Sequence, residues 1–467
     1  MKEILVYLSD QHDPLVSGVY GNPWVDTPNL DRIAKEGHVF EHAYTPCPLC
    51  VPARLSFLTG KRPSKLNIFN NDCALRGDQP TIAHAIGAAG YETTLVGRMH
   101  FKGVDQTHGF DHHRVGDITT QFWGNGGGRR KDLGAFVGTT NMKGCLDLVG
   151  GGDSPVLDFD ECVVDDTLHL LGEKSERPRF IVTGTYAPHF SYAAPKDLYE
   201  KYKERLRRVN EDIKSENHAA YRHMERQIDD ELLLSIRAAY YGMVENMDQQ
   251  IGRVYDAWKK SLKASGRDGI FVYVSDHGDM LGERKMVGKQ TFYERSVRVP
   301  LIIAGDGIES GRTTVPVSLL DLSRSLVDWA QANLIPEMEG ENLMTIAKEG
   351  RKDPVVAEHV IDRKDGCYAG KMVVTESHKA FYFDGIGDLT LYSRLENGNM
   401  QALAANDSEK QSWMDLIKEE WDPESVIDRY KKRKADQQVL IQWGKEKCPA
   451  ETGRVVYKRG DFQKPEF

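Results

Sequence analysis

Several absences limit what this chain of 467 residues can be. It has no apolar run long enough to cross a bilayer, so we expect no membrane span. Its formal net charge is −9, and this lack of basic excess argues against a general nucleic-acid binder. It has only seven cysteines, an odd number without zinc-like spacing, so we expect a reduced, cytoplasmic protein.

The N-terminal segment also lacks the pattern of a secretory leader. Residues 4–8 are an apolar run that is too short for a signal peptide, and no small-residue cleavage site follows it. We interpret this run as the start of a buried strand.

Apolar runs alternate with amphipathic stretches along most of the chain. Runs typical of buried strands lie at 4–9, 180–185, 270–275 and 299–304, and a charged, mostly helical stretch covers about 195–260. Strands that alternate with helices indicate an α/β fold with a doubly wound, mostly parallel sheet.

The pattern changes after about residue 352. The runs at 371–375 and 379–383 predict antiparallel strands, and 408–416 predicts a helix. We therefore expect a large domain over 1–352 and a small C-terminal α+β subdomain over 353–467.

Acidic residues directly follow two of the predicted strands. Asp10 follows the first strand, and Asp276 follows the strand at 270–275. Ligands of doubly wound sheets bind beyond the carboxyl ends of the strands, so both side chains are candidates for a binding site. The plainer alternative is that each of them only caps a helix.

The most informative segment is CVPARLSFLTG at 50–60. Pro52 suits the first turn of a helix, where its missing N–H costs nothing. Cys50 would then lie at the helix N-terminus, where free N–H groups and the helix dipole favour an anion. Arg54 would lie one turn later on the same side. The alternative is a buried cysteine beside a helix-starting proline.

This segment resembles the signature of type I sulfatases, a branch of the alkaline phosphatase superfamily, and the resemblance extends over about residues 1–325. It implies that a sulfatase-maturing enzyme oxidises Cys50 to Cα-formylglycine. In that family one hydroxyl of the hydrated aldehyde attacks sulfur and expels the alcohol, and the other then lets the aldehyde reform and release sulfate. Arg54 is implied to hold the nucleophile or a sulfate oxygen.

Three further segments match sulfate-binding groups of the family. The segment GRMH at 97–100 resembles Gly-Lys-Trp-His, which puts Arg98 in the place of the family's lysine and His100 beside the aldehyde hydrate. Arginine keeps the positive charge and can bind sulfate bidentately, although it is bulkier than lysine. His189 matches a second histidine that binds sulfate and is the candidate acid for the leaving alcohol. Lys289 matches a late sulfate-binding lysine. Taken alone, His189 and Lys289 would be interpreted as surface residues.

The resemblance also implies one divalent cation. Its ligands would be Asp10, Gln11, Asp276, His277 and the converted Cys50. Oxygen ligands favour Ca²⁺. His277 stands where many sulfatases have asparagine, and its nitrogen makes Mn²⁺ the alternative.

One branch of the family is more similar than the others. The segments PLCVPAR at 48–54, DQTHGF at 105–110 and SDHGDMLGER at 275–284 are similar to choline sulfatases. The C-terminal third does not carry this similarity, so the substrate is a separate question.

Two kinds of leaving alcohol compete. Choline would need a cage of aromatic rings, for which the candidates are Phe122, Trp123, Tyr186 and Phe190. A sulfated sugar, which we favour, would need polar side chains aimed at ring hydroxyls. The candidate substrate-binding residues are Asn71, Asp72, His108, Trp123 and Tyr293. The basic run 129–131, in a long Gly-rich loop predicted over 124–152, could contact a second anion, but we favour its interpretation as solvated surface charge.

Three functional hypotheses follow from these patterns. The first is a sulfatase acting on a small sulfated substrate, matured by a dedicated enzyme and with an oligomer left open. The second is a phosphonate or phosphodiester hydrolase on the same scaffold. The third is a non-catalytic binder of sulfate esters, in which Cys50 is never converted.

Overall fold

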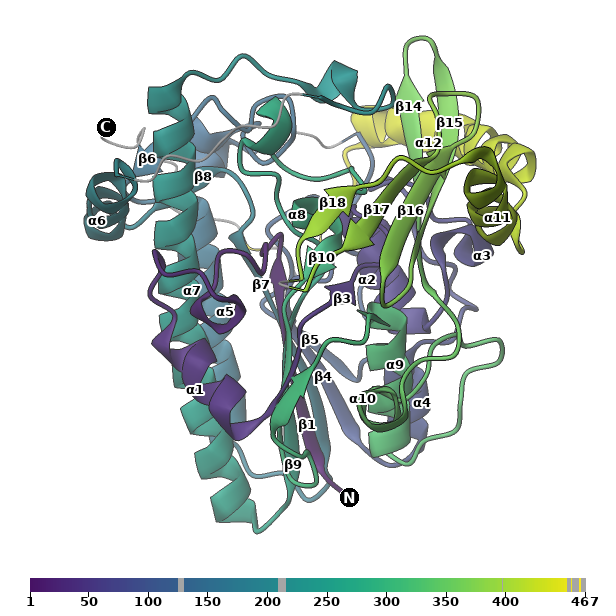
Figure 1. The fold of residues 1–467 in the computed structure, drawn as a ribbon. Coiled ribbons are helices and arrows are strands. Elements are labelled where there is room, and N and C mark those ends of the chain that lie inside the picture. The colour runs from purple at the N-terminus through teal and green to yellow at the C-terminus, as the bar shows by residue number, and fades with distance from the viewer. Residues whose placement is uncertain (125–129, 209–215, 397, 452–454, 456–461, 463–467) are drawn as a thin grey trace.

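A large twisted sheet forms the centre of the molecule (Figure 1). The computed structural model describes residues 1–124, 130–208, 216–396, 398–451, 455 and 462. In these residues the sheet has eight strands. In spatial order they are β12 (Gly311–Thr313), β2 (His38–Phe40), β11 (Leu301–Gly305), β9 (Gly269–Ser275), β1 (Glu3–Asp10), β7 (Arg179–Pro188), β4 (Glu92–Gly97) and β5 (His112–Arg114).

The middle of the sheet is parallel, as expected for the predicted α/β fold. Strand β1 pairs in parallel with β7 and with β9, so that Ile4 lies between Phe180 and Ile270. Strand β11 is antiparallel to β9, and the expected strand at 299–304 is interrupted at Pro300. The reason is that proline has no N–H to donate to a sheet ladder. The prediction of a mostly parallel sheet is confirmed.

Helices cover both faces of the sheet (Figure 1), and alternate residues of β1 show this division. Leu5 and Tyr7 enter the core on one face, whereas Ile4 and Val6 enter the core on the other. The first face is covered by α1 (Pro28–Glu36), α5 (Pro155–Gly172) and α7 (Asp230–Ser265). The second is covered by α2 (Cys50–Thr59), α4 (Ile82–Ala88), α9 (Leu319–Trp329) and α10 (Leu343–Glu349).

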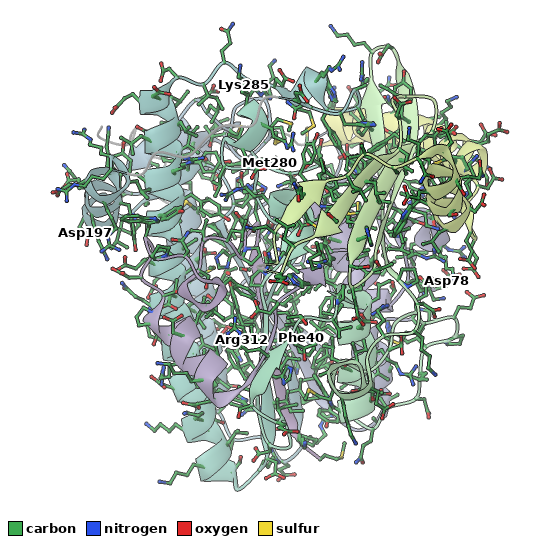
Figure 2. All side chains as sticks on the ribbon, in the orientation of Figure 1. Phe40, Asp78, Asp197, Met280, Lys285 and Arg312 are labelled. Atoms are coloured by element: carbon green, nitrogen blue, oxygen red, sulfur yellow. The ribbon has the colours of Figure 1, made fainter. Side chains whose placement is uncertain are left out.

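Side chains fill the space between the sheet and these helices (Figure 2). The labelled Phe40 and Met280 are fully buried, whereas Asp78 and Asp197 lie on the periphery. In the described part of the chain, no helix is both long enough and apolar enough to cross a membrane.

Two expected regions differ from their predictions. The mostly helical stretch at 195–260 consists of α6 (Lys196–Leu206) and α7, and the described residues between them add only the 3-10 turn η4 (Arg222–Met224). The Gly-rich stretch expected to be a loop contains η3 (Lys131–Phe136) and β6 (Val149–Gly151), which pairs with β8 (Tyr192–Ala194).

The end of the chain forms an antiparallel sheet with two helices. The predicted strands and helix are present here, and the structure adds a long helix that the sequence analysis missed. The elements are β14 (Val355–Arg363), β15 (Gly366–Val374), β16 (His378–Phe383), β17 (Thr390–Arg394), β18 (Met400–Ala402), α11 (Asp407–Lys418) and α12 (Pro423–Lys447).

Short elements connect these layers. A small sheet of β10 (Arg298–Val299), β3 (Ala43–Tyr44) and β13 (Val317–Ser318) lies beside the large one. The remaining short helices are η1 (Gly18–Tyr20), α3 (Pro63–Leu66), η5 (Glu283–Lys285) and α8 (Glu294–Val297).

Candidate active site

Cys50 is the first residue of α2, as the sequence predicted. Pro52 lies within the first turn, and every residue of the helix is buried. The side-chain oxygen of Asn71 accepts a hydrogen bond of 3.0 Å from the backbone N–H of Val51, one of the donors that a helix start leaves unpaired. Asn71 therefore helps to fix the end of the helix that carries Cys50.

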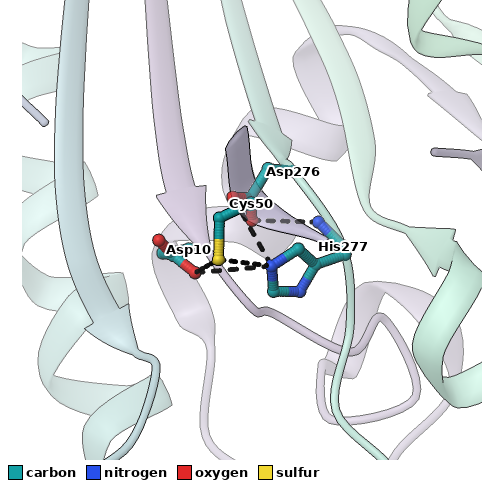
Figure 3. Close-up of side chains that lie close together, drawn as sticks. All are labelled: Asp10, Cys50, Asp276 and His277. Atoms are coloured by element: carbon teal, nitrogen blue, oxygen red, sulfur yellow. Dashed lines mark hydrogen bonds and ion pairs between the residues drawn. The ribbon is translucent and has the colours of Figure 1, made fainter. Parts of the chain in front are cut away.

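Four potential ligands meet at the carboxyl ends of β1 and β9 (Figure 3). Asp10, Cys50, Asp276 and His277 each offer one ligand atom, and these atoms all lie within 4.8 Å of one another. The two carboxylates come together because β1 and β9 are neighbouring parallel strands paired up to Ser9 and Ser275. All four residues are buried.

Two buried arginines orient these carboxylates. Arg54 donates from Nε to Asp276 Oδ2 at 2.8 Å and from Nη2 to Asp10 Oδ2 at 3.1 Å. Arg98 donates from Nε to the same Asp10 oxygen at 2.6 Å. Burial opposes ionisation of Asp10, but these cations hold the pKa of its carboxyl well below the usual value. The other oxygen of Asp10, Oδ1, lies 3.9 Å from the sulfur of Cys50.

The group is suited to a divalent cation. It combines two carboxylates with an imidazole nitrogen, and His277 Nε2 lies 3.7 Å from Asp10 Oδ1 and 3.6 Å from Asp276 Oδ2. Burial disfavours a charged imidazole, but Asp276 and Cys50 outweigh burial and raise the pKa of His277. The local field therefore favours a positive charge at this point.

Gln11 lies beside this group, and its amide is held in one orientation. Its Nε2 donates to Asp279 Oδ2 at 2.5 Å, and its Oε1 accepts from Lys289 Nζ at 2.6 Å. Asp279 also accepts hydrogen bonds from Tyr192 and from the backbone N–H of Gly288, which keep it in place. That Gln11 binds a cation stays a prediction.

The predicted sulfate-binding groups line the same cavity as Cys50. Lys289 Nζ contacts His189 Nε2 directly. Both side chains are buried. Burial, followed by the charge of Lys289, lowers the pKa of His189 well below its usual value. Arg98 Nη2 lies 2.8 Å from His100 Nδ1. Burial and the charge of Arg98 lower the pKa of His100 as well, so both imidazoles are neutral near pH 7.

A cavity of about 410 Å³ opens beside Cys50. The predicted residues Asn71, Asp72, Arg98, His100, His189 and Lys289 all line it. The cavity is also lined by five residues that the sequence patterns did not indicate, namely Lys102, Thr119, Thr120, Asn141 and Gln290. Of these five residues, only Lys102 could have been found from the sequence, because it follows Arg98 and His100 at the same two-residue spacing.

Three predicted substrate-binding residues lie outside the cavity lining. His108 packs against Phe101, with Nδ1 3.2 Å from Asp105. The Tyr293 hydroxyl accepts from the backbone of His218 within an aromatic core.

Trp123 is connected to the cavity only through Asp72, because its indole donates a hydrogen bond of 2.6 Å to the backbone oxygen of that residue. Phe122, a further aromatic candidate, packs edge-on against Trp443. In the basic run 129–131, Arg129 lies outside the described residues, and Arg130 lines the cavity but is paired with Asp132 at 2.9 Å.

Known proteins resemble this chain over most of its length. The protein-family model described as Sulfatase matches residues 4–332. A choline-sulfatase of Rhizobium meliloti (strain 1021) is 30% identical, over 77% of this chain and 74% of its own length. An arylsulfatase of Clostridium perfringens (strain 13 / Type A) is 27% identical, over 82% of this chain and 86% of its own length.

Solved structures share the fold. A phosphonate monoester hydrolase from Silicibacter pomeroyi superimposes with a TM-score of 0.70 at 18% identity, covering 90% of this chain and 94% of its own. A protein solved in complex with its substrate D-glucosamine-2-N,6-O-disulfate has a TM-score of 0.67 at 17% identity, covering 92% and 98%. The matched span contains Cys50 and the residues predicted to bind the metal and the sulfate. The chain belongs to the sulfatase family, and it is a sulfuric ester hydrolase.

Proposed function

We propose that the protein hydrolyses the O-sulfate ester of a sulfated sugar, using a formylglycine made from Cys50 and one divalent cation. The observation that carries this proposal is that Asp10, Asp276 and His277 meet at Cys50, which lines the cavity. Lys289 and Arg98 line the same cavity as positively charged groups.

The converted residue would supply a hydrated aldehyde, a nucleophile that can later release the bound sulfate. The cation would polarise the sulfate and hold the nucleophile, with Ca²⁺ favoured by the carboxylates and Mn²⁺ the alternative because of His277. The ligands would be Asp10, Asp276 and His277, with the amide oxygen of Gln11.

The surrounding side chains have separate tasks in this proposal. Lys289 and Arg98 stabilise the negative charge that develops on the sulfate in a cavity shielded from water. In the free protein the charge of Lys289 helps to keep the His189 imidazole neutral. The bound sulfate would offset that charge, so that His189 takes up a proton and then gives it to the leaving oxygen. Arg54 holds both carboxylates in place.

The cavity favours a sugar over choline. Tyr186 and Phe190 are the only phenyl or phenol rings among the described residues that line it. Each already faces a protein cation. The Arg98 guanidinium lies 4.5 Å from the centroid of the Tyr186 ring, and Lys289 Nζ lies 4.8 Å from that of Phe190. A quaternary ammonium would lack a free aromatic face and would meet like charges.

Polar groups line the rest of the cavity. Asn71, Asp72, Thr120 and Asn141 offer the donors and acceptors that ring hydroxyls need. The segments at 48–54 and 275–284 that resemble choline sulfatases contain Cys50 and Asp276, and in this proposal they serve the sulfate, which every substrate of this class shares.

The seven cysteines bear on where the protein works. None of them forms a disulfide. We therefore place the protein in a reducing compartment, the cytoplasm, where a maturing enzyme would act on Cys50.

The test is to co-express the protein with a sulfatase-maturing enzyme and weigh the peptide that contains Cys50. We expect the peptide to exchange its thiol for an aldehyde, and the matured protein to release sulfate from sugar sulfates faster than from choline sulfate. Aryl sulfate and aryl phosphonate in the same assay separate a sulfatase from a phosphonate hydrolase. An unconverted cysteine in a fully active protein, or equal activity of Cys50→Ala, would exclude the mechanism.

A further inference from the structure

Lys102 lines the cavity, and the proposed sulfate chemistry does not use its positive charge. It lines the cavity with Arg98 and His100, and the three residues alternate along the chain. The residues between them, Met99 and Phe101, point into the apolar core. The segment after β4 therefore presents three polar side chains to the cavity, while Met99 and Phe101 pack it against the core.

Lys102 is almost completely buried, with 8% of its surface exposed. Its Nζ donates to the backbone oxygen of Thr120 at 2.7 Å and lies 3.3 Å from the Thr120 hydroxyl. An ammonium group has three N–H donors, and Thr120 offers it only a backbone oxygen and a hydroxyl. Thr120 alone therefore does not use all the donors of Lys102.

No carboxylate forms an ion pair with Lys102 in the described part of the chain. Arg98, by contrast, is paired with Asp10 at 2.6 Å and with Asp117 at 3.0 Å. Arg130 is paired with Asp132 at 2.9 Å.

Three acidic groups act on Lys102 from its surroundings, and in the described part of the chain none of them forms an ion pair with it. Asp72, Asp117 and Glu451 act on it from a distance, and they only partly offset the burial that lowers the pKa of its ammonium. Asp72 is solvent-exposed, and Asp117 is already bound by Arg98 and Thr119. A buried cation that keeps its charge needs an anionic partner, which a ligand can supply.

We infer that Lys102 binds a second anionic group of the substrate, a carboxylate or a further sulfate on the sugar whose O-sulfate is cleaved. The inference rests on the proposed function and narrows its substrate class to acidic sulfated sugars. The size of the cavity, about 410 Å³, falls within the range that small ligands occupy. Lys289 and Arg98 serve the sulfate at Cys50, and Lys102 serves the second anion.

A competing explanation is that Lys102 only braces the segment around Thr120. Two substitutions separate the explanations. Lys102→Met removes the charge and the brace, whereas Lys102→Arg keeps the charge. Lys174→Met is the matched control, since Lys174 is an exposed lysine beyond the end of α5 and does not line the cavity.

The experiment compares sugar sulfates in pairs that differ by one anionic group. N-acetylglucosamine 6-O-sulfate with glucosamine 2-N,6-O-disulfate is one pair, and sulfated hexoses with the matching sulfated uronates supply the carboxylate pairs. The quantity measured is the ratio of kcat/KM for the anionic and the neutral member of each pair, with an aryl sulfate as a reference.

We expect the matured wild type to prefer the anionic member of at least one pair by about tenfold or more, equivalent to ~1.4 kcal/mol. Lys102→Met should abolish that ratio, Lys102→Arg should keep most of it, and Lys174→Met should behave as wild type. Which pairs show the ratio distinguishes a carboxylate from a second sulfate.

Two outcomes would overturn the inference. One is a wild type without preference in any pair. The other is a Lys102→Met variant that loses activity on both members equally, which would make the lysine a brace only. Failure of the proposed function gives a different result, because the wild type would then turn over no sugar sulfate, whether or not it cleaves the aryl sulfate.

Discussion

His277 Nε2 lies 3.2 Å from the sulfur of Cys50, at the N-terminus of α2. The two residues come from distant parts of the chain, and the contact connects the proposed cation site to the residue that would become the nucleophile. Substitutions on either side of this contact therefore have distinct expected effects.

Binding of a divalent cation should raise the melting temperature of the protein. A ligand present at a hundredfold excess over its Kd stabilises the native state by about 2.7 kcal/mol. Calorimetry with Ca²⁺, with Mn²⁺ and with a chelator measures the effect and ranks the two ions. His277→Ala should shrink the rise, because one ligand is lost. His112→Ala, at an exposed histidine, is the control, and an equal rise in both variants would remove His277 from the site.

Arg54→Met should destabilise the protein strongly when no cation is bound. It leaves the buried carboxylates of Asp10 and Asp276 without a shared partner, and breaking a buried ion pair costs about 3–5 kcal/mol. Denaturant unfolding measures this cost. Arg32→Met breaks the exposed pair with Asp256 and should cost only about 0–1 kcal/mol. A divalent cation should recover part of the loss in Arg54→Met and none in the control. If both variants lose the same stability, the pairing seen here does not support the site.

Lys289→Met should lower kcat by roughly 10²-fold or more for every sulfate ester, because this cation stabilises charge on the transferred group. Steady-state kinetics on an aryl sulfate and on sugar sulfates provide the comparison. The expected pattern differs from that of Lys102→Met, whose effect should depend on the substrate. A loss confined to one substrate would instead make Lys289 a specificity residue.

Stability should fall at acid pH through Glu294. Burial opposes its ionisation, but Lys379, 2.5 Å away, and two arginines lower its pKa to about 2 from an ordinary value of 4.5. Because the folded-state pKa is depressed, the contribution is complete above about pH 4.5 and is lost as the pH falls towards 2. At about 1.36 kcal/mol per pKa unit, it amounts to roughly 3 kcal/mol.

Glu294→Gln provides the measurement for this pair. The difference in unfolding free energy between wild type and the variant should be largest near neutral pH and should shrink below pH 4.5. Glu349→Gln, at an exposed glutamate, should show no such trend. A difference that stays constant with pH would mean that the pKa of Glu294 is the same in the folded and the unfolded protein.

The sequence by itself determined the class of the fold, and it predicted the chemistry at Cys50. Pro52 and the apolar residues after it specify a buried helix start through local backbone preferences, and the apolar runs specify buried strands in the same way. These signals are local, so they could be interpreted without a structure. The resemblance of the segments around Arg98, His189 and Lys289 to family motifs predicted the sulfate-binding groups, and the structure brings all three residues to one cavity.

Only the tertiary structure decided which side chains meet. Sheet order places Asp10 beside Asp276, and the same packing lets one arginine, Arg54, bind both carboxylates. The packing also places His108 and Tyr293 in the interior of the protein and Lys102 in the lining of the cavity. The physical reason is that local preferences fix the direction of a side chain relative to its own strand or helix. The contents of a cavity depend on how distant elements pack against one another, and short-range sequence patterns do not encode that packing.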